Sequence, residues 1–100
     1  MAVRYESSER VATITIDREA KLNALNAETL DELDAAVRSA RDDSSVRVVV
    51  LTGAGSKAFV AGADIAEMSA LSPDEARRFA RSGQEVTRLI ELLPKPVIAA

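Results

Sequence analysis

The segment Lys57–Met68, which reads K-A-F-V-A-G-A-D-I-A-E-M, carries the residues best suited to chemistry. The side chains of Ala61, Gly62 and Ala63 are too small to shield the main chain. Such a run between a buried strand and a short polar helix can present bare backbone N–H groups to a ligand, and fixed donors need little reorganisation when negative charge develops nearby. The segment therefore indicates an oxyanion hole, with an ordinary tight turn as the alternative.

The composition excludes several other kinds of chemistry. The chain has no cysteine and no histidine, so a disulfide framework, a thiolate nucleophile and a cysteine metal site are excluded, and the commonest base and metal ligand is missing. We expect no metal. Any acid–base chemistry must use carboxylates, lysine or tyrosine.

Four blocks of the sequence resemble, in the same order, blocks of the crotonase or enoyl-CoA hydratase superfamily. The Lys57–Met68 segment matches the first oxyanion-hole motif of that family, K-A-F-x-A-G-A-D-I-x-E-M. The other three are Lys21-Leu22-Asn23-Ala24-Leu25-Asn26, Val48-Val49-Val50-Leu51-Thr52-Gly53 and Lys95-Pro96-Val97-Ile98-Ala99-Ala100. The resemblance implies an α/β fold, the crotonase-type spiral of ββα units.

Family members are well over twice as long, so we expect residues 1–100 to be the N-terminal part of a single crotonase-like core domain. The final Val97-Ile98-Ala99-Ala100 has the pattern of a buried strand with no polar tail, whereas natural termini are usually exposed. A self-sufficient small protein is the alternative. As an isolated chain, these residues are expected to be inactive.

The resemblance also implies an activity. Crotonases bind acyl-coenzyme A thioesters and stabilise an enolate or tetrahedral oxyanion with two backbone N–H groups, the first of which corresponds here to that of Ala63. The second donor and the two glutamates of hydratases lie beyond Ala100. The motif looks most like hydratases, which add water to 2-enoyl-CoA. Isomerases, hydrolases, decarboxylases and dehalogenases share this first loop and remain alternatives.

The same resemblance places the coenzyme A part of the thioester substrate against two blocks, and no cofactor is expected. These residues are Leu22 and Ala24 in the first block, and Ala61, Ala63, Asp64, Ile65 and Ala66 in the second. Two of these residues also have a purely structural explanation. Leu22 would be a core leucine, and the Asp64 side chain would cap a helix starting near Ile65. Glu67 is not expected to act as an acid or base, and the full-length protein is expected to form a homo-trimer or hexamer.

Two functions from other classes compete with this reading. Gly53, Gly55 and Ala58 satisfy the dinucleotide fingerprint G-x-G-x-x-A after a strand, with Asp74 and Glu75 about 20 residues further on. That fingerprint requires a helix to start within the glycine turn, and helix signals come only later. The other alternative is a non-catalytic docking or assembly fragment.

Charge and hydropathy limit the classes of partner that the protein can bind. The chain is 47% hydrophobic and 29% charged, as in soluble globular proteins, and its apolar runs are far shorter than the roughly 20 residues that span a bilayer. We therefore expect a cytoplasmic protein without a membrane partner. The net charge of −3 argues against nucleic acid. Arg18, Lys21 and Lys57 could meet a polyphosphate, with solvated surface charge as the alternative.

Residue patterns predict the first elements. Val11–Asp17 alternates apolar and polar residues and predicts a strand, with Val3–Ser7 as its hairpin partner. Asn26 is a candidate N-cap for a helix that ends at Asp42-Asp43-Ser44-Ser45. Its apolar face comprises Leu30, Leu33, Val37 and Ala40. The continuous apolar run within Val46–Thr52 predicts a strand covered on both faces, as in a parallel sheet.

A second, longer helix is predicted after the chemical segment. Ser72 is a candidate cap, Pro73 suits the first helical position, and Glu75 completes a capping box. One apolar stripe comprises Ala76, Phe79, Ala80, Gly83, Val86, Ile90 and Leu93, and Pro94 and Pro96 close the helix. Gly83 would cost about 1 kcal/mol relative to alanine unless close packing needs it.

Overall fold

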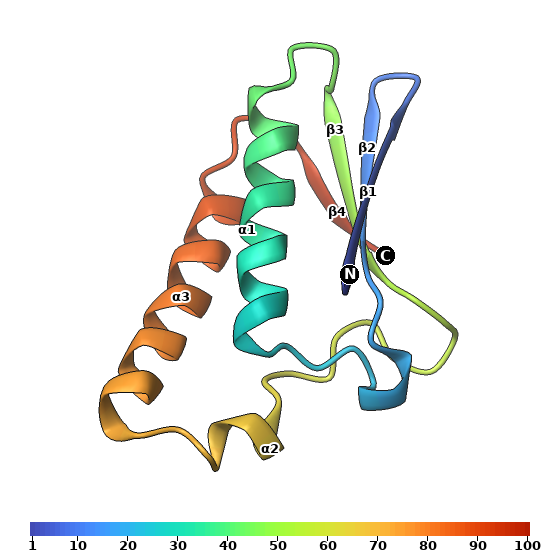
Figure 1. Ribbon diagram of the computed structural model, residues 1–100. Helices are drawn as coiled ribbons and strands as arrows, with labels where there is room; N and C mark the ends of the chain where they lie inside the picture. The colour runs from blue at the N-terminus through green and yellow to red at the C-terminus, as the bar shows by residue number, and fades with distance from the viewer.

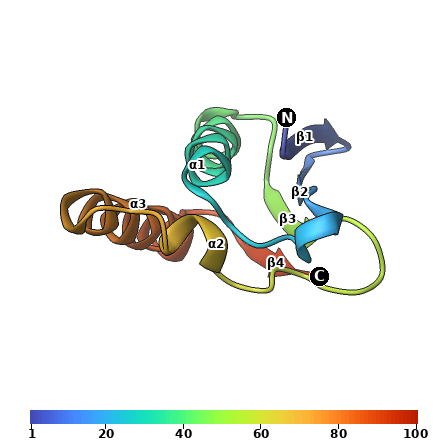
Figure 2. The same ribbon diagram turned by 60° about the horizontal axis from the view of Figure 1, so that its bottom comes forward.

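The computed structural model describes residues 1–100 as one four-stranded sheet with two long helices on the same face (Figures 1 and 2). The elements, in chain order, are β1 (Val3–Ser8), β2 (Val11–Ile16), a 3₁₀ turn at Glu19–Lys21, α1 (Ala27–Asp42), β3 (Val48–Gly53), α2 (Ile65–Met68), α3 (Pro73–Glu91) and β4 (Val97–Ala99). The predicted α/β class is confirmed, and the predicted strands and helices lie within a few residues of these bounds.

The strand pairing determines which loops meet. β1 and β2 form the expected antiparallel hairpin, whereas β2, β3 and β4 run parallel in the order β1-β2-β3-β4. Parallel neighbours need a crossover connection, which α1 provides between β2 and β3 and α3 between β3 and β4. Ile16 pairs with Gly53 at the carboxyl ends of β2 and β3. The chain segments that follow these two strands therefore leave the sheet side by side.

The hydrophobic core lies between the sheet and the helices. Alternate residues of β2, namely Ala12, Ile14 and Ile16, are buried beneath α1, as their period of two requires. The predicted apolar face of α1 is buried too, and its N-cap is confirmed because the Asn26 side chain accepts a hydrogen bond from the Thr29 N–H at 2.8 Å.

Within residues 1–100, β3 is fully covered on one face only, so the prediction that both faces are covered stays a prediction for the whole protein. Val49 points into the core and is 2% exposed, while Val48 and Val50 are half-buried on the opposite face. In Figure 2 both long helices, α1 and α3, lie on the other side of the sheet. The parallel pairing inferred from the same apolar run is correct, since β3 lies between two parallel neighbours.

Helix α3 starts as the sequence predicts and then departs from the expected burial. Both bonds of the capping box form, between the Glu75 N–H and Ser72 Oγ at 3.2 Å and between the Ser72 N–H and Glu75 Oε1 at 3.0 Å. Of its predicted stripe, Val86 and the following Leu93 are buried, whereas Ala76 and Ala80 are exposed. In the first half of α3, the half-buried Phe79 packs against the core, and the other residues of that half are exposed or half-buried.

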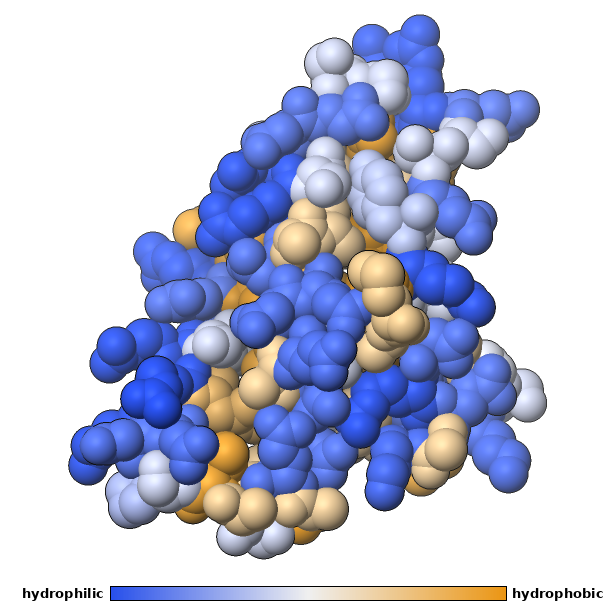
Figure 3. All heavy atoms as spheres, viewed as in Figure 1, coloured by the Kyte–Doolittle hydropathy of each residue, from blue (hydrophilic) through white to orange (hydrophobic).

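Hydrophilic side chains cover most of the face in Figure 3, and apolar ones show between them along α3. None of the helices combines the length and apolar character needed to cross a membrane.

Gly83 lies inside α3 without a packing reason for glycine. An added Cβ would meet only Leu30 Cδ1, at 3.9 Å. We expect Gly83→Ala to raise the free energy of unfolding by about 0.5–1 kcal/mol, because alanine favours a helix interior and restricts the unfolded chain. Denaturant unfolding measures this.

The matched control is Gly55→Ala, the same change in a loop. Gly55 has φ +79°, and its Cβ would lie 2.9 Å from the carboxyl carbon of Glu19, so this variant should lose stability. A less stable Gly83→Ala protein would contradict the prediction.

Candidate active site

Two loops that follow neighbouring parallel strands meet beyond the carboxyl edge of the sheet. The Leu25 N–H donates to the Gly62 carbonyl at 2.7 Å, and the Asp64 N–H donates to the Leu25 carbonyl at 2.8 Å. Leu25 and Ala63 thus form an isolated parallel bridge. A third bond, from the Ala61 N–H to the Leu22 carbonyl at 3.1 Å, extends the contact. The two blocks singled out in the sequence therefore lie side by side.

This bridge sets the direction of the Ala63 N–H. No peptide bond is cis, so the N–H of Ala63 points opposite to the carbonyl of Gly62 in the same peptide plane. That carbonyl points at Leu25, and the Ala63 N–H consequently points away from Leu25. No hydrogen bond of the chain uses this N–H or that of Gly62, whereas Ala61 and Asp64 donate theirs within the fold. Gly62 and Ala63 thus carry two successive free N–H groups, and that of Ala63 is the one turned away from Leu25.

Ala63 also lies at the wall of an apolar cavity of about 480 Å³ between the sheet, α1 and α3. Phe59 and Val60 line the cavity on the same loop, and Phe79 and Ala80 line it from α3. An apolar wall lowers the local dielectric and so strengthens a hydrogen bond to developing negative charge. The site can accept a carbonyl oxygen at Ala63 and an apolar chain beside it.

The Asp64 carboxylate is used inside the fold. It accepts the Glu67 N–H at 3.2 Å, which confirms the predicted helix cap, and pairs with Arg18 Nη2 at 3.0 Å. The backbone N–H of Glu67 is the main cause that holds the pKa of Asp64 below its ordinary value, and the Arg18 guanidinium adds to it. The Glu67 carboxylate accepts the Ala27 N–H at 3.1 Å and so joins α2 to the start of α1.

Arg18 is neither of the two things that the sequence predicted, a contact for polyphosphate or a solvated surface charge. Its side chain is 16% exposed and bonds Asp64 and the Ala24 carbonyl, so it is neither a solvated surface charge nor a free partner for polyphosphate. Lys21 and Lys57 are exposed, as expected of surface charges.

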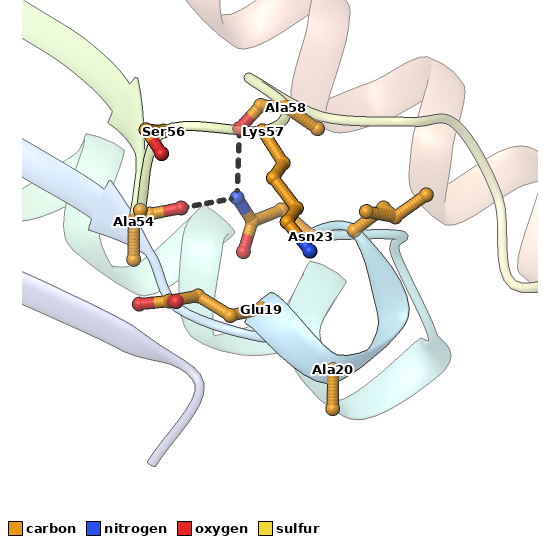
Figure 4. Close-up of a pocket in the computed structure, with 9 residues that line it drawn as sticks. Glu19, Ala20, Asn23, Ala54, Ser56, Lys57 and Ala58 are labelled. Atoms are coloured by element: carbon orange, nitrogen blue, oxygen red, sulfur yellow. Dashed lines mark hydrogen bonds between the residues drawn. The ribbon is translucent and has the colours of Figure 1, made fainter.

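Asn23 is the functional residue that the sequence analysis missed. It is 1% exposed with φ +59°. Its Oδ1 accepts the Arg18 N–H at 2.8 Å, and its Nδ2 donates to the carbonyls of Ala54 at 2.9 Å and Ala58 at 3.0 Å (Figure 4). Asparagine is enriched at positive φ, so a loop asparagine just before the small Ala24 was the available signal.

The glycine loop after β3 has a packing role. A Cβ on Gly53 would lie 1.9 Å from the Phe59 carbonyl oxygen, so glycine is required there by close approach. No helix starts in this loop, since the next begins at Ile65, and Asp74 and Glu75 lie in the first turn of α3. The dinucleotide fingerprint lacks its structural context, which removes that alternative.

The structure brings the candidate coenzyme residues to one edge. Leu22 is 48% exposed, so the core-leucine alternative is wrong. Ala61 and Ala66 are exposed, Ile65 is 80% exposed at the start of α2, and Ala24 is half-buried. Their contact with coenzyme A stays a prediction.

Three comparisons relate this chain to known proteins. The family model described as enoyl-CoA hydratase/isomerase matches residues 6–100. The short-chain-enoyl-CoA hydratase of Clostridium acetobutylicum is 52% identical over 98 residues, which are 98% of this chain and 38% of that protein. The crotonyl-CoA hydratase of Syntrophomonas wolfei is 52% identical over 95 residues, which are 95% of this chain and 36% of that protein.

A solved structure agrees with these relatives. The crystal structure of the enoyl-CoA hydratase from Bacillus anthracis superposes with a TM-score of 0.94 at 33% identity, covering 99% of this chain and 39% of that one. The expected crotonase-type fold is confirmed for its N-terminal part. The chain spans little more than a third of the length of these relatives.

Replacing Asn23 with aspartate tests the link between the loops. The change keeps the shape, but it turns a donor that faces two carbonyl oxygens into a buried anion. We expect Asn23→Asp to lower the free energy of unfolding by about 3 kcal/mol or more at pH 7, measured by denaturant unfolding.

Asn26→Asp is its matched control. The Asn26 side chain only accepts hydrogen bonds, at the N-terminus of α1, where a carboxylate is favourable. Equal losses for the two variants would contradict the role assigned to Asn23.

The Asp64 contacts predict a pH dependence of stability. Because its pKa in the folded state lies below the ordinary 3.8, the ionised carboxylate stabilises the fold above that value, and this stabilisation is lost as the pH falls through the folded-state pKa. The difference in thermal midpoint between wild type and Asp64→Asn should be constant from about pH 7 to pH 5 and shrink below about pH 4.

The exposed Asp31, whose side chain makes no hydrogen bond, provides the control Asp31→Asn. A difference for Asp64→Asn that stays constant to the lowest pH would contradict the prediction.

Proposed function

The chain belongs to the enoyl-CoA hydratase/isomerase family, and from that premise we propose that the whole protein is an enoyl-CoA hydratase-like lyase. It would add water across the 2,3-double bond of enoyl-CoA thioesters. The observation that carries this proposal is the uncommitted Ala63 N–H, turned away from Leu25 at the wall of an apolar cavity. These residues would supply one part of the site, since the chain spans only part of its relatives' length.

The proposed mechanism uses Ala63 at the step where charge develops. When water attacks C3 of the enoyl group, electrons move through C2 to the thioester oxygen and form an enolate, which is then protonated at C2. A donor that already points at this oxygen bonds the enolate more strongly than the neutral carbonyl. One such donor is worth about 3 kcal/mol. No general acid or base is assigned within these residues.

Coenzyme A is proposed to lie along the joined loops, against Leu22, Ala24, Ala61, Asp64, Ile65 and Ala66. Exposure of Leu22, Ala61 and Ile65 at one edge supports this placement. The Asp64 side chain is occupied by Arg18 and Glu67, so this residue would contribute main-chain contacts. No cofactor besides the thioester substrate is proposed.

The hydratase reaction is preferred over the isomerase, hydrolase and dehalogenase reactions of the superfamily because two relatives at 52% identity are named hydratases. A cytoplasmic homo-trimer or hexamer remains part of the proposal, and light scattering on the whole protein distinguishes it from a monomer.

Ala63→Pro in the whole protein tests the proposed donor. Proline lacks the N–H, and this N–H is not used in the fold. We expect kcat for hydration of crotonyl-CoA to fall by about 10²–10³, with a thermal midpoint close to that of wild type. Loss of the enoyl absorbance measures the rate.

Ala63→Gly keeps the N–H and removes only a methyl group, so its kcat should stay within a few-fold of wild type. Wild-type turnover by the proline variant would disprove the assignment of Ala63.

A further inference from the structure

We propose that Arg18 is a positioning residue for the Ala63 donor, acting through the two residues next to the Leu25–Ala63 bridge. This inference rests on the proposed function. Arg18 lies near the start of the loop that follows β2, and its guanidinium joins the Ala24 carbonyl and the Asp64 carboxylate. Ala24 precedes one bridge residue, and Asp64 follows the other.

Arg18 is itself held in place before it makes these contacts. Its N–H donates to Asn23 Oδ1 at 2.8 Å, and its carbonyl accepts the N–H groups of Lys21 at 2.8 Å and Asn23 at 2.9 Å. The Arg18 side chain is 16% exposed, and that of Asp64 is 11% exposed. A fixed planar guanidinium can hold two acceptors at defined angles, which a flexible ammonium cannot do equally well.

The donor needs such a restraint because its peptide plane is hinged on glycine. Gly62 has φ +123° and open space where a Cβ would lie, so the plane that carries the Ala63 N–H has little steric restraint of its own. Two hydrogen bonds define the bridge, and each adds only a modest net stabilisation. Arg18 adds a charged link on the same side and holds the plane in one orientation.

Arg18 also neutralises the charge nearest to the donor. Asp64 follows Ala63 directly, and an uncompensated carboxylate there would oppose negative charge on a thioester oxygen bound at the Ala63 N–H. The Arg18–Asp64 contact at 3.0 Å offsets this charge. Arg18→Lys keeps the positive charge but loses the planar guanidinium that bonds two acceptors, whereas Arg18→Met removes both. The two variants therefore separate the effect of the guanidinium geometry from the effect of the charge.

The experiment uses the whole protein as wild type, Arg18→Lys, Arg18→Met and the control Arg38→Met. Arg38 makes an exposed ion pair with Asp34 within α1 at 2.9 Å, far in the sequence from both loops. Three quantities are measured: the thermal midpoint, kcat and KM for crotonyl-CoA, and the C=O stretching frequency of a bound, isotope-labelled unreactive thioester. That frequency falls as the donor polarises the carbonyl, so it reports on donor geometry in the folded protein.

We expect Arg18→Lys to lower kcat by about tenfold to a hundredfold with KM little changed, because displacement of a donor by a fraction of an ångström is costly. The carbonyl shift should shrink in Arg18→Lys and shrink further in Arg18→Met. Arg38→Met should match wild type in all three measurements. If Arg18→Met does not fold, Arg18→Lys alone carries the test.

A full wild-type carbonyl shift in folded Arg18→Lys would overturn the inference, even if its thermal midpoint fell, because Arg18 would then be structural only. If wild type bound the thioester with no carbonyl shift at all, the proposed function would fail first, and the inference with it.

Discussion

The pairing of Leu25 with Ala63 is the contact on which the candidate site depends. It joins two loops that are far apart in sequence, and it turns one peptide plane so that the Ala63 N–H points away from Leu25 and stays free. Two hydrogen bonds of about 1 kcal/mol each cannot offset the backbone entropy of ordering both loops, which is about 1–2 kcal/mol per residue. The pairing forms because the fold brings the loops together in advance.

The sheet and the buried hydrogen bonds next to the Leu25–Ala63 bridge bring the two loops together. Parallel pairing of β2 and β3 starts both loops at one edge. Gly53 lets the second loop pass within contact of the first, and Asn23 Nδ2 ties the two loops through two hydrogen bonds, to the Ala54 and Ala58 carbonyls. A third bond, from the Arg18 N–H to Asn23 Oδ1, holds Asn23 within its own loop. Because Asn23 is buried, breaking one of these bonds would leave a polar group without water. The site is therefore built on an inner polar layer that the ligand would not touch.

The cavity beside Ala63 follows from the same arrangement. Only the second half of α3 packs closely on α1, at Val86 and beyond, and the first half, apart from the half-buried Phe79, diverges from the core. An apolar hollow of about 480 Å³ sacrifices packing stability. The same hollow gives the donor a surrounding of low polarity, in which its electrostatic effect is larger than in water. Here stability and the proposed function make opposite demands on α3.

Local patterns were sufficient to predict the elements, because the signals for strands and caps lie within a few residues. The alternation in β2, the Asn26 and Asp64 caps and the capping box at Ser72 all follow from such signals. Long-range contacts were not predictable in this way. The burial of Arg18 depends on a partner 46 residues away, and the half-open face of β3 depends on what lies above the sheet, which no run of valines can reveal.

Because the proposed donor is a main-chain N–H, the residues that control it are those that orient its peptide plane, and not the side chain of residue 63. No side chain can supply or delete the Ala63 N–H, apart from proline, so the identity of residue 63 matters mainly through its size. What the sequence must control is the orientation of the Gly62–Ala63 peptide plane. That control lies with Gly62, which permits the required φ, and with Asn23 and Arg18, which hold the loops against each other. Substitutions that impair such a site without touching the ligand are therefore expected behind the bridge, where the polar links are buried and the side chains have few ways to rearrange.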